Sequence, residues 1–396
     1  MENTDNLKYW IWLSQTLGGT SAFLKLIEYY NGSPGAAASA LIENRDKSGA
    51  CDKMKSEKFT AVTLEAAVEA LELCRSSGYD IVSFESPLYP MALRGIKNPP
   101  PVLFTKGDPG ILRNERRIAL VGSRATGGDQ LETAFSLSFA IAACGCTVVS
   151  GAAAGIDSAA HRGAVLSGKS IAVLGAGLLS LEKGSAARLY GDISENTLYI
   201  SEFLPDTPAA KYNYPRRNRI ISGLSAATAV IGANVKSGAL ITAECAFSQG
   251  RRVLVHSSDN SPGCTELKNA GAEAFSSALE IKELLPELFP EDCAFPLKCF
   301  PSAFLSELLK AAGEKTPLAA PEKSPEKPPA QKKEPPEWLS PAAKSVLAAF
   351  SDKKTLLPDE ITLITGLSAS EVMVSLTELE LEELIKLLPG NRFTAV

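Results

Sequence analysis

The chain has 396 residues, with 40 basic and 45 acidic side chains and a formal net charge of −5, so its overall charge argues against a general affinity for nucleic acid. Its length exceeds what one hydrophobic core usually organises, which predicts two or three domains. The eight cysteines show no CxxC pair or other metal-ligand spacing, which favours reduced thiols and argues against a metal site.

The beginning of the chain does not resemble a targeting segment. Glu2 and Asp5 replace the basic start of a signal peptide, and no apolar run approaches the ~18 residues that a membrane span needs. These features predict a cytoplasmic protein without membrane association.

Residues 1–80 carry apolar side chains at helical spacing. Trp10, Ile11 and Leu13 precede the turn Leu17-Gly-Gly-Thr20, and the pattern returns from Leu64 to Cys74. The residues alone are explained equally well by a small helical packing domain as by a binding module, because the turn lacks a clear basic anchor.

Residues 81–311 read as an α/β domain, in which short apolar runs alternate with glycine loops and helical stretches. The runs of buried-strand type are 117–121, 147–151, 170–174, 199–203, 227–232 and 252–256. This alternation predicts a mostly parallel sheet covered by helices on both faces. In such sheets the ligand crevice lies beyond the carboxyl ends of the strands.

Glycine-containing loops at those strand ends offer backbone N–H groups at helix N-termini, where an anion is favoured. Arg124 and Lys236 add positive charge at two of the loops, and Asp157 is expected to cap the helix that runs through His161. Each glycine loop alone is also explained by ordinary turn chemistry. Their occurrence at one sheet edge favours a phosphate site.

The run Lys211-Tyr-Asn-Tyr-Pro-Arg-Arg-Asn-Arg219 combines four basic residues with two aromatic rings and no acid. Arginine presents planar charged groups to phosphate oxygens, while tyrosine offers a face on which any base can stack. A solvated basic loop is the plain alternative. The neighbouring phosphate-type loops favour binding of single-stranded nucleic acid.

The C-terminal part changes in character. Residues 312–337 consist mainly of Pro, Lys, Glu and Ala, which predicts a disordered linker. Residues 338–396 then predict helices near Ser345 and Pro358, and a third helix that begins with a capping box formed by Ser368 and Glu371. The short final segment 389–394 leaves room for only a minimal wing.

No catalytic constellation is evident in the sequence. The chain has two histidines, His161 and His256, for which a structural role is expected, although His161 lies near a phosphate-type loop. The segment Gly175-Ala-Gly177-Leu-Leu-Ser180 is an incomplete GxGxxG motif, so neither a dinucleotide nor another cofactor is expected.

These residues resemble the DNA-processing protein A family (DprA, also called Smf). The motifs that carry the resemblance, in the family's order, are Val121-Gly-Ser-Arg124, Val149–Asp157 with His161, Ala172–Gly177, Ser201-Glu202, Tyr214–Ser225, Lys236–Thr242 and Gln249-Gly-Arg251, preceded by Tyr89-Pro90 and Pro99–Phe104 with Gly107-Asp108.

The chain departs from the family pattern at several places. It has Leu178–Ser185 where the family usually has Tyr-Pro and Asn, Leu204-Pro-Asp206 in place of Pro-Pro-Gly, and Tyr214-Pro215 in place of Phe-Pro. His256-Ser-Ser and Ser261–Thr265 also differ from the usual last-strand motifs. The change to Tyr214 keeps a stacking ring, whereas the other changes alter one wall of the predicted pocket.

The resemblance implies an extended Rossmann-like domain at 81–311 that binds single-stranded DNA without cutting it and helps to load the RecA recombinase during natural transformation and recombination. It also implies a homodimer, a SAM-like or helix-hairpin-helix domain at 1–80 and a winged helix at 338–396. Arg124, Lys211, Tyr214 and Asn218 match family residues that contact DNA. The predicted nucleic-acid site comprises Gly122, Ser123, Arg124, Ser150, Gly151, Gly155, Lys211, Tyr214, Arg217, Asn218, Arg219, Lys236, Ser237 and Gly238.

Two further predictions follow. The third helix of the winged helix carries Glu371, Glu378, Glu380, Glu382 and Glu383, which would repel DNA and favour a protein-contact role. The alternative function is a Rossmann-like nucleoside-monophosphate phosphoribohydrolase related to the lysine-decarboxylase-like family. That class would be expected to show a Pro-Gly-Gly-x-Gly-Thr loop with a catalytic glutamate, which this chain lacks in that form.

Overall fold

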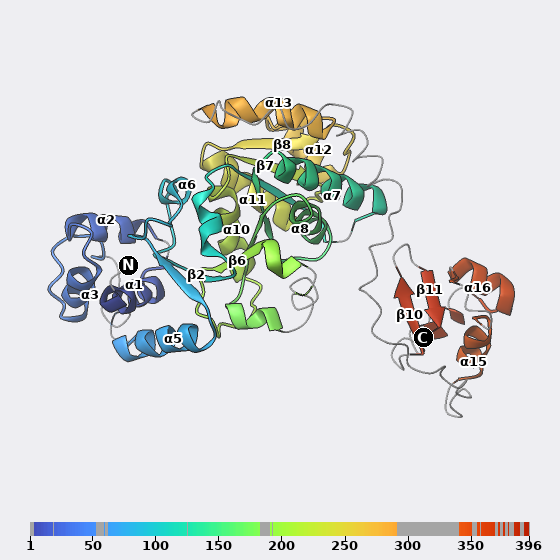
Figure 1. Cartoon of the computed structure of the whole chain (residues 1–396), viewed down its shortest axis with the longest axis horizontal. Coiled ribbons are helices and arrows are strands. Elements are labelled where there is room, and N and C mark those ends of the chain that lie inside the picture. The colour runs from blue at the N-terminus through green and yellow to red at the C-terminus, as the bar shows by residue number, and fades with distance from the viewer. Residues whose placement is uncertain are drawn as a thin grey trace. The chain divides into compact units, whose positions relative to one another are not determined.

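The computed structural model forms two compact units, Met1–Thr316 and Pro317–Val396, each of which is described by itself (Figure 1). The residues that it describes are 4–18, 20–52, 59, 62–124, 126–182, 191, 193–290, 340–350, 355–356, 358–368, 371–372, 375–376, 379, 384–388 and 392–395. The predicted linker at 312–337 lies outside them. Among the described residues no helix has the length and apolar character needed to cross a membrane.

The first unit is built on a nine-stranded sheet with the order β1-β2-β6-β5-β4-β3-β7-β8-β9. The strands are β1 (Asp80–Ser83), β2 (Val102–Lys106), β3 (Arg117–Gly122), β4 (Thr147–Gly151), β5 (Ser170–Val173), β6 (Thr197–Ser201), β7 (Ala227–Ile231), β8 (Arg252–His256) and β9 (Glu273–Phe275). From β6 to β9 all neighbours pair in parallel, whereas β1 and β2 add an antiparallel edge. The mostly parallel sheet that the sequence predicts is confirmed.

Alternate residues of the parallel strands point to opposite faces, and each face has its own helical cover. One face packs on α7 (Gly128–Ala143), α8 (Ile156–Val165) and α13 (Ala278–Leu288). The other packs on α6 (Met91–Arg94), α10 (Asn213–Gly223), α11 (Gly238–Ser248) and α12 (Pro262–Asn269). Short 3₁₀ helices lie at η1 (Pro109–Arg113), η2 (Leu178–Glu182) and η3 (Ser194–Asn196).

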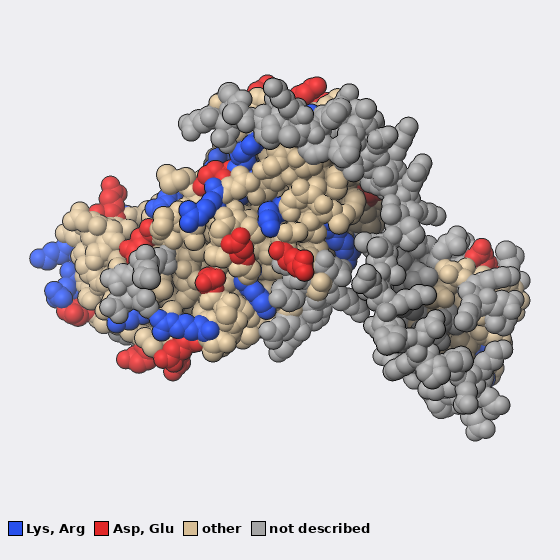
Figure 2. Space-filling model, viewed as in Figure 1, with Lys and Arg blue, Asp and Glu red and all other residues tan. Residues whose placement is uncertain are grey.

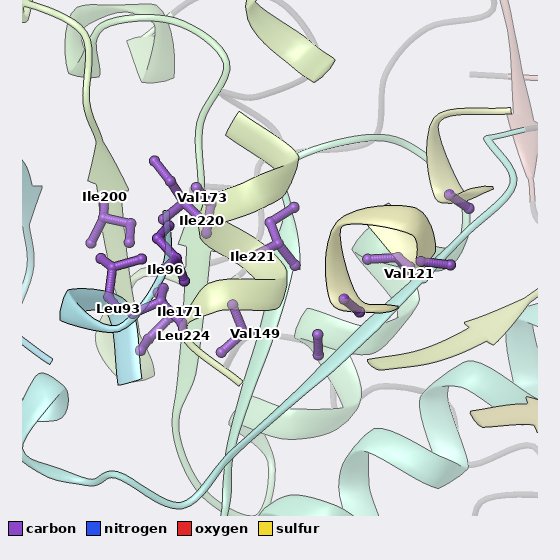
Figure 3. Close-up of a cluster of buried hydrophobic side chains, with 14 of the residues drawn as sticks. Leu93, Ile96, Val121, Val149, Ile171, Val173, Ile200, Ile220, Ile221 and Leu224 are labelled. Atoms are coloured by element: carbon purple, nitrogen blue, oxygen red, sulfur yellow. The ribbon is translucent and has the colours of Figure 1, made fainter. Parts of the chain in front are cut away.

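Figure 3 shows how α10 is held on the sheet. Ile220, Ile221 and Leu224 meet side chains from α6 and from the central strands, including Val149 and Val173. The sequence pattern does not predict this helix, because the first half of its sequence is polar and basic. The basic run that begins at Lys211 is therefore the entrance and first turns of a helix and not a free loop.

The N-terminal helices are α1 (Thr4–Thr16), α2 (Ser21–Tyr29), α3 (Pro34–Ile42) and α5 (Leu64–Ser76), in agreement with the helical pattern of the sequence. Their core is continuous with the sheet, because Trp10, Phe23 and Leu71 belong to one buried cluster with Phe104 and Tyr199. Assignment of this segment to a SAM-like class stays a prediction.

The second unit contains α15 (Pro341–Ala348), α16 (Pro358–Thr365) and the antiparallel pair β10 (Ile385–Leu388) and β11 (Arg392–Ala395). Val346, Phe350, Ile361 and Phe393 share its buried core. The predicted capping box is present, since the Glu371 backbone N–H donates to Ser368 Oγ at 3.3 Å while the Ser368 backbone N–H donates to Glu371 Oε2 at 2.9 Å. Of the five predicted acids of the third helix, those from Glu378 onwards lie outside the described residues.

Candidate nucleic-acid interface

A cavity of about 570 Å³ lies where the strand order reverses. The chain proceeds from β3 through β4, β5 and β6 on one side and returns to β7 on the other, so the loops after β3 and β7 diverge there. The lining residues are Val121, Gly122, Ser123, Arg124, Ala153, Asp157, Lys211, Tyr214, Pro215, Arg217, Asn218, Ile221, Ser237, Gly238, Ala239, Ile241 and Thr242.

Most of the predicted site residues meet at this cavity. The predicted residues that line it are Gly122, Ser123, Arg124, Lys211, Tyr214, Arg217, Asn218, Ser237 and Gly238. Those that do not line it are Ser150, Gly151, Gly155, Arg219 and Lys236. Segments distant in sequence therefore converge at the predicted sheet edge, although not every basic residue of the run faces the ligand space.

The loop after β3 is held close to the loop after β4. A Cβ on Gly155 would come within 2.4 Å of the Ser123 carbonyl oxygen, and Gly155 has a φ of +81°, so this position requires glycine. Gly155 is also the residue that precedes α8, which corrects the expectation that Asp157 caps this helix: Asp157 lies in the first turn. This packing presents the exposed Arg124 at the mouth of the cavity.

Lys211 and Tyr214 enter the cavity from the beginning of α10. Lys211 is exposed, and it forms no ion pair with any acid among the described residues. The half-buried Tyr214 ring packs against the backbone of Gly175, where an added Cβ would lie 2.6 Å from the ring. The Arg124 guanidinium carbon lies over the same ring, 5.1 Å from its centroid. A base that stacks on Tyr214 must therefore displace Arg124 or share the ring with it.

Arg217 lies beneath the cavity with only 5% of its surface exposed. Its Nη1 donates to the Val173 carbonyl oxygen, its Nε donates to Asn218 Oδ1 at 2.9 Å, and its Nη2 is 4.0 Å from Asp157 Oδ2. Gly151 makes room for it, because a Cβ there would overlap the guanidinium. Arg217 thus ties β5 and α8 to α10 under the pocket, and its predicted contact with nucleic acid stays a prediction.

Burial also shifts the pKa values of Asp157 and Arg217. It raises the pKa of the Asp157 carboxyl to about 6, against the opposing influence of the Arg217 charge. It lowers the pKa of the Arg217 guanidinium. The floor of the cavity therefore holds one buried cation and one weakly acidic carboxyl.

Asn218 and Arg219 also have partners inside the protein. Asn218 Nδ2 donates to the Gly238 carbonyl oxygen at 3.0 Å and so joins α10 to the start of α11. Arg219 donates through Nη1 and Nη2 to the two carboxylate oxygens of Glu202 at 2.9 and 2.8 Å, and through Nε to the Asn98 carbonyl oxygen at 3.0 Å. The Arg219 guanidinium is thus engaged by Glu202 and does not line the cavity, so its contact with nucleic acid stays a prediction.

The loop after β7 closes the opposite wall. Ser237 precedes α11 and lines the cavity, and its Oγ is buried without a hydrogen-bond partner among the described residues. The first N–H groups of a helix lack intrahelical partners. The exposed Lys236, which immediately precedes Ser237, adopts a left-handed φ of +62°. Such an angle is uncommon for a residue other than glycine. This wall offers hydrogen-bond donors of the kind that an anion accepts.

His161 is a structural residue, as expected. It is fully buried, its Nε2 lies 2.8 Å from the Gly151 carbonyl oxygen, and its Nδ1 lies 2.6 Å from Ser170 Oγ. Because a carbonyl can only accept, Nε2 carries the proton and Nδ1 accepts from the Ser170 hydroxyl. Burial lowers the pKa of the His161 imidazole to about 4. The imidazole holds the end of β4 in place and does not reach the cavity.

The charge at the cavity differs from the overall charge of the chain, which is −5. Basic and acidic side chains are interspersed on the face of the first unit drawn in Figure 2. In the cavity, by contrast, the charged lining residues are Arg124, Lys211 and Arg217 against the single acid Asp157. The cavity can therefore hold a phosphate between exposed cations and helix N-termini, with an aromatic ring beside it.

The chain matches family models and known proteins. Residues 80–286 match the model of the family described as DNA recombination-mediator protein A, and residues 325–391 match the DprA winged helix domain. The chain is 34% identical to Protein Smf of Synechocystis over 328 residues, which cover 78% of each chain. It is 37% identical to the DNA processing protein DprA of Bacillus subtilis over 218 residues, which cover 54% of this chain and 73% of that one.

A solved structure is similar as well. The X-ray structure of DNA processing protein A from Streptococcus pneumoniae superposes with a TM-score of 0.58 at 28% identity. The match covers 72% of this chain and 98% of that one. The winged-helix assignment of the C-terminal segment and the Rossmann-like assignment of the sheet are thereby confirmed.

Proposed function

The chain belongs to the family of DNA recombination-mediator protein A, and we propose that it binds single-stranded DNA, without sequence preference, in the cavity between β3, β7 and α10. Its function is DNA processing related to recombination. The finer proposal includes loading of the RecA recombinase onto the bound strand, in natural transformation or recombination, by a homodimer of this chain without catalysis.

The observation that carries the proposal is the convergence at one cavity of Arg124, from the loop after β3, with Lys211 and Tyr214, from the start of α10. Two exposed cations placed beside an aromatic ring and two helix N-termini suit a sugar-phosphate strand whose bases are free. A duplex hides its base faces in the stack, so the ring would contribute nothing to duplex binding.

Two experiments test the proposal. Fluorescence anisotropy with labelled oligonucleotides should show preference for single strands, little dependence on sequence and a steep fall of affinity with salt, because each neutralised phosphate releases counterions. Equal affinity for duplex, or no salt dependence, contradicts it. Incubation with nucleoside monophosphates tests the hydrolase alternative, since release of free base by the purified chain would support that function instead.

Loading of RecA needs a separate assay. The full chain should speed formation of RecA filaments on single strands, and variants that lose DNA binding should lose this effect. Filament formation that is unchanged by the chain, under conditions in which it binds DNA, contradicts this part of the proposal alone.

A further inference from the structure

We infer that Tyr212 forms a second base-stacking position outside the cavity, so that consecutive bases of a bound strand separate at the N-terminus of α10. This inference rests on the proposed function and extends its site. Tyr212 is not among the predicted site residues. In the sequence it lies between Lys211 and Tyr214, which both line the cavity.

Exposure distinguishes the two tyrosines. Tyr212 is 72% exposed, and its side chain has no hydrogen bond, ion pair or ring contact with any described residue. Tyr214 is half-buried between Gly175 and the Arg124 guanidinium. The ring that is open to a base without rearrangement is therefore Tyr212. An aromatic ring held in water at this exposure, next to a cation of the cavity, is typical of a stacking platform.

The backbone fixes where this ring lies. Tyr212 is the residue that precedes α10, with helix-like angles of φ −74° and ψ −16°. The next residue, Asn213, is 1% exposed, and its backbone N–H donates to the Ala210 carbonyl oxygen at 3.0 Å. The burial and the hydrogen bond of Asn213 fix the start of the helix. The position of Tyr212 therefore does not depend on a mobile loop. Residues two apart on a helix do not face the same side, which places Tyr212 outside when Tyr214 faces in.

The spacing suits a single strand. The Cα atoms of Tyr212 and Tyr214, two residues apart at a helix start, lie within about 7 Å of each other, and nucleotides repeat about every 3.4 Å along a strand of B-form DNA. A base at Tyr214 and a neighbouring base at Tyr212 can therefore be joined by a backbone that passes Lys211. The two bases lie on opposite sides of the helix start, and the phosphate between them meets the Lys211 ammonium group. A duplex cannot separate its bases in this way.

The first experiment compares tyrosine variants of the full chain by anisotropy with labelled oligothymidylate. Tyr212→Ala should weaken binding roughly 5- to 150-fold, the range for loss of one stacked base, and should leave the salt slope unchanged. Tyr212→Phe keeps the ring and should bind within about twofold of the unmodified protein. The matched control is Tyr29→Ala, because Tyr29 is 51% exposed on α2 among the N-terminal helices and lines no part of the cavity.

A second experiment locates the base. Oligonucleotides that lack one base at successive positions should bind the unmodified protein more weakly at the position that stacks on Tyr212. In Tyr212→Ala the loss at that position should disappear, while losses at other positions remain, because both changes remove the same contact. A purely structural role of Tyr212 would weaken binding at all positions alike.

The outcomes are distinct. Tyr212→Ala that binds like the unmodified protein overturns the inference and leaves the proposed function standing. Intact DNA binding combined with lost RecA filament loading also overturns it, and assigns the ring to a protein contact. Absence of single-strand binding by the unmodified protein overturns the proposed function and the inference together.

Discussion

The two ends of the basic run Lys211–Arg219 differ in what they face. At the beginning, Lys211 and Tyr212 are both exposed, Lys211 lining the cavity and Tyr212 lying outside it. At the end, Arg217 and Arg219 are engaged by carboxylates and carbonyls of the protein. The run spans a helix start, so its first residues precede the helix while later ones fall on the face that packs on the sheet. A cluster of like charges in sequence therefore divides into ligand contacts and scaffold contacts.

The largest expected effect comes from the scaffold end. Arg217→Ala should lower the free energy of unfolding by about 3–5 kcal/mol, because it leaves the buried Asp157 carboxyl without its cation. Chemical denaturation measures this. Arg216→Ala is the matched control, since Arg216 is 52% exposed and its nearest carboxylate is 3.8 Å away; it should change stability by less than about 1 kcal/mol. Equal losses in the two variants would show that burial does not distinguish these arginines.

The second effect concerns pH. The pKa of His161 is lowered from 6.5 to about 4, so the folded protein keeps the imidazole neutral while the unfolded chain takes up a proton below about 6.5. The contribution of the neutral His161 imidazole to the free energy of unfolding is complete above about pH 6.5. It is lost as the pH falls towards 4, by about 3 kcal/mol in all. The cost of His161→Gln, measured by denaturation against the unmodified protein, should therefore shrink by about this amount between pH 7 and 4.

Asp157 titrates with the opposite sign over much of the same range. Its folded pKa of about 6 exceeds the ordinary 3.8, so the folded state gains stability as pH falls through 6. The two contributions offset each other in the unmodified protein, whose own pH profile is therefore a poor measure of either. A cost of His161→Gln that is independent of pH would contradict the neutral, buried imidazole.

The sequence allowed prediction of the sheet because parallel strands buried on both faces read as short apolar runs. It allowed prediction of the cavity because glycine loops at the ends of such strands meet at one edge. It did not reveal α10, whose early residues are polar, or the strands β1, β2 and β9, of which the two at the sheet edges, β1 and β9, have only four and three residues. The winged-helix capping box was readable because its two residues are only three positions apart.

The partners of the arginines could not be predicted from the sequence. Glu202 precedes Arg219 by 17 residues and lies directly after β6, and Asp157 is farther still from Arg217 in the sequence. Only the packing of α10 on β4 and β5 brings them together. An isolated acid within a motif, such as Glu202 after Ser201, is the signal that would have suggested an internal partner for one of the basic residues.

The residues that face the cavity are tested by measuring DNA binding rather than the free energy of unfolding. Arg124→Ala and Lys211→Ala should each weaken single-strand binding by about 1.5–3 kcal/mol, the range for hydrogen bonds that involve a charge. Each should also flatten the slope of log affinity against log salt by about one unit, because one phosphate contact is lost. Both residues are exposed, so the free energy of unfolding should stay within about 0.5 kcal/mol of the unmodified protein. Arg219→Ala, whose side chain contacts Glu202, should leave the salt slope unchanged; a flattened slope there would place Arg219 on the strand after all.

The smallest expected effect is that of removing the winged helix. If the cations at the start of α10 carry the affinity, deletion of residues 338–396 should leave single-strand binding within a few-fold of the full chain. The first unit has its own continuous core, and its cavity is lined entirely by residues of that unit. Anisotropy on the shortened chain, with circular dichroism to confirm that it is folded, measures this.

RecA filament loading by the same preparation should fall if the winged helix contacts a partner, because a tethered module contributes reach to a protein contact. Collapse of DNA binding in the folded, shortened chain would instead show that the second unit supplies phosphate contacts, and that the division within the basic run describes only part of the site.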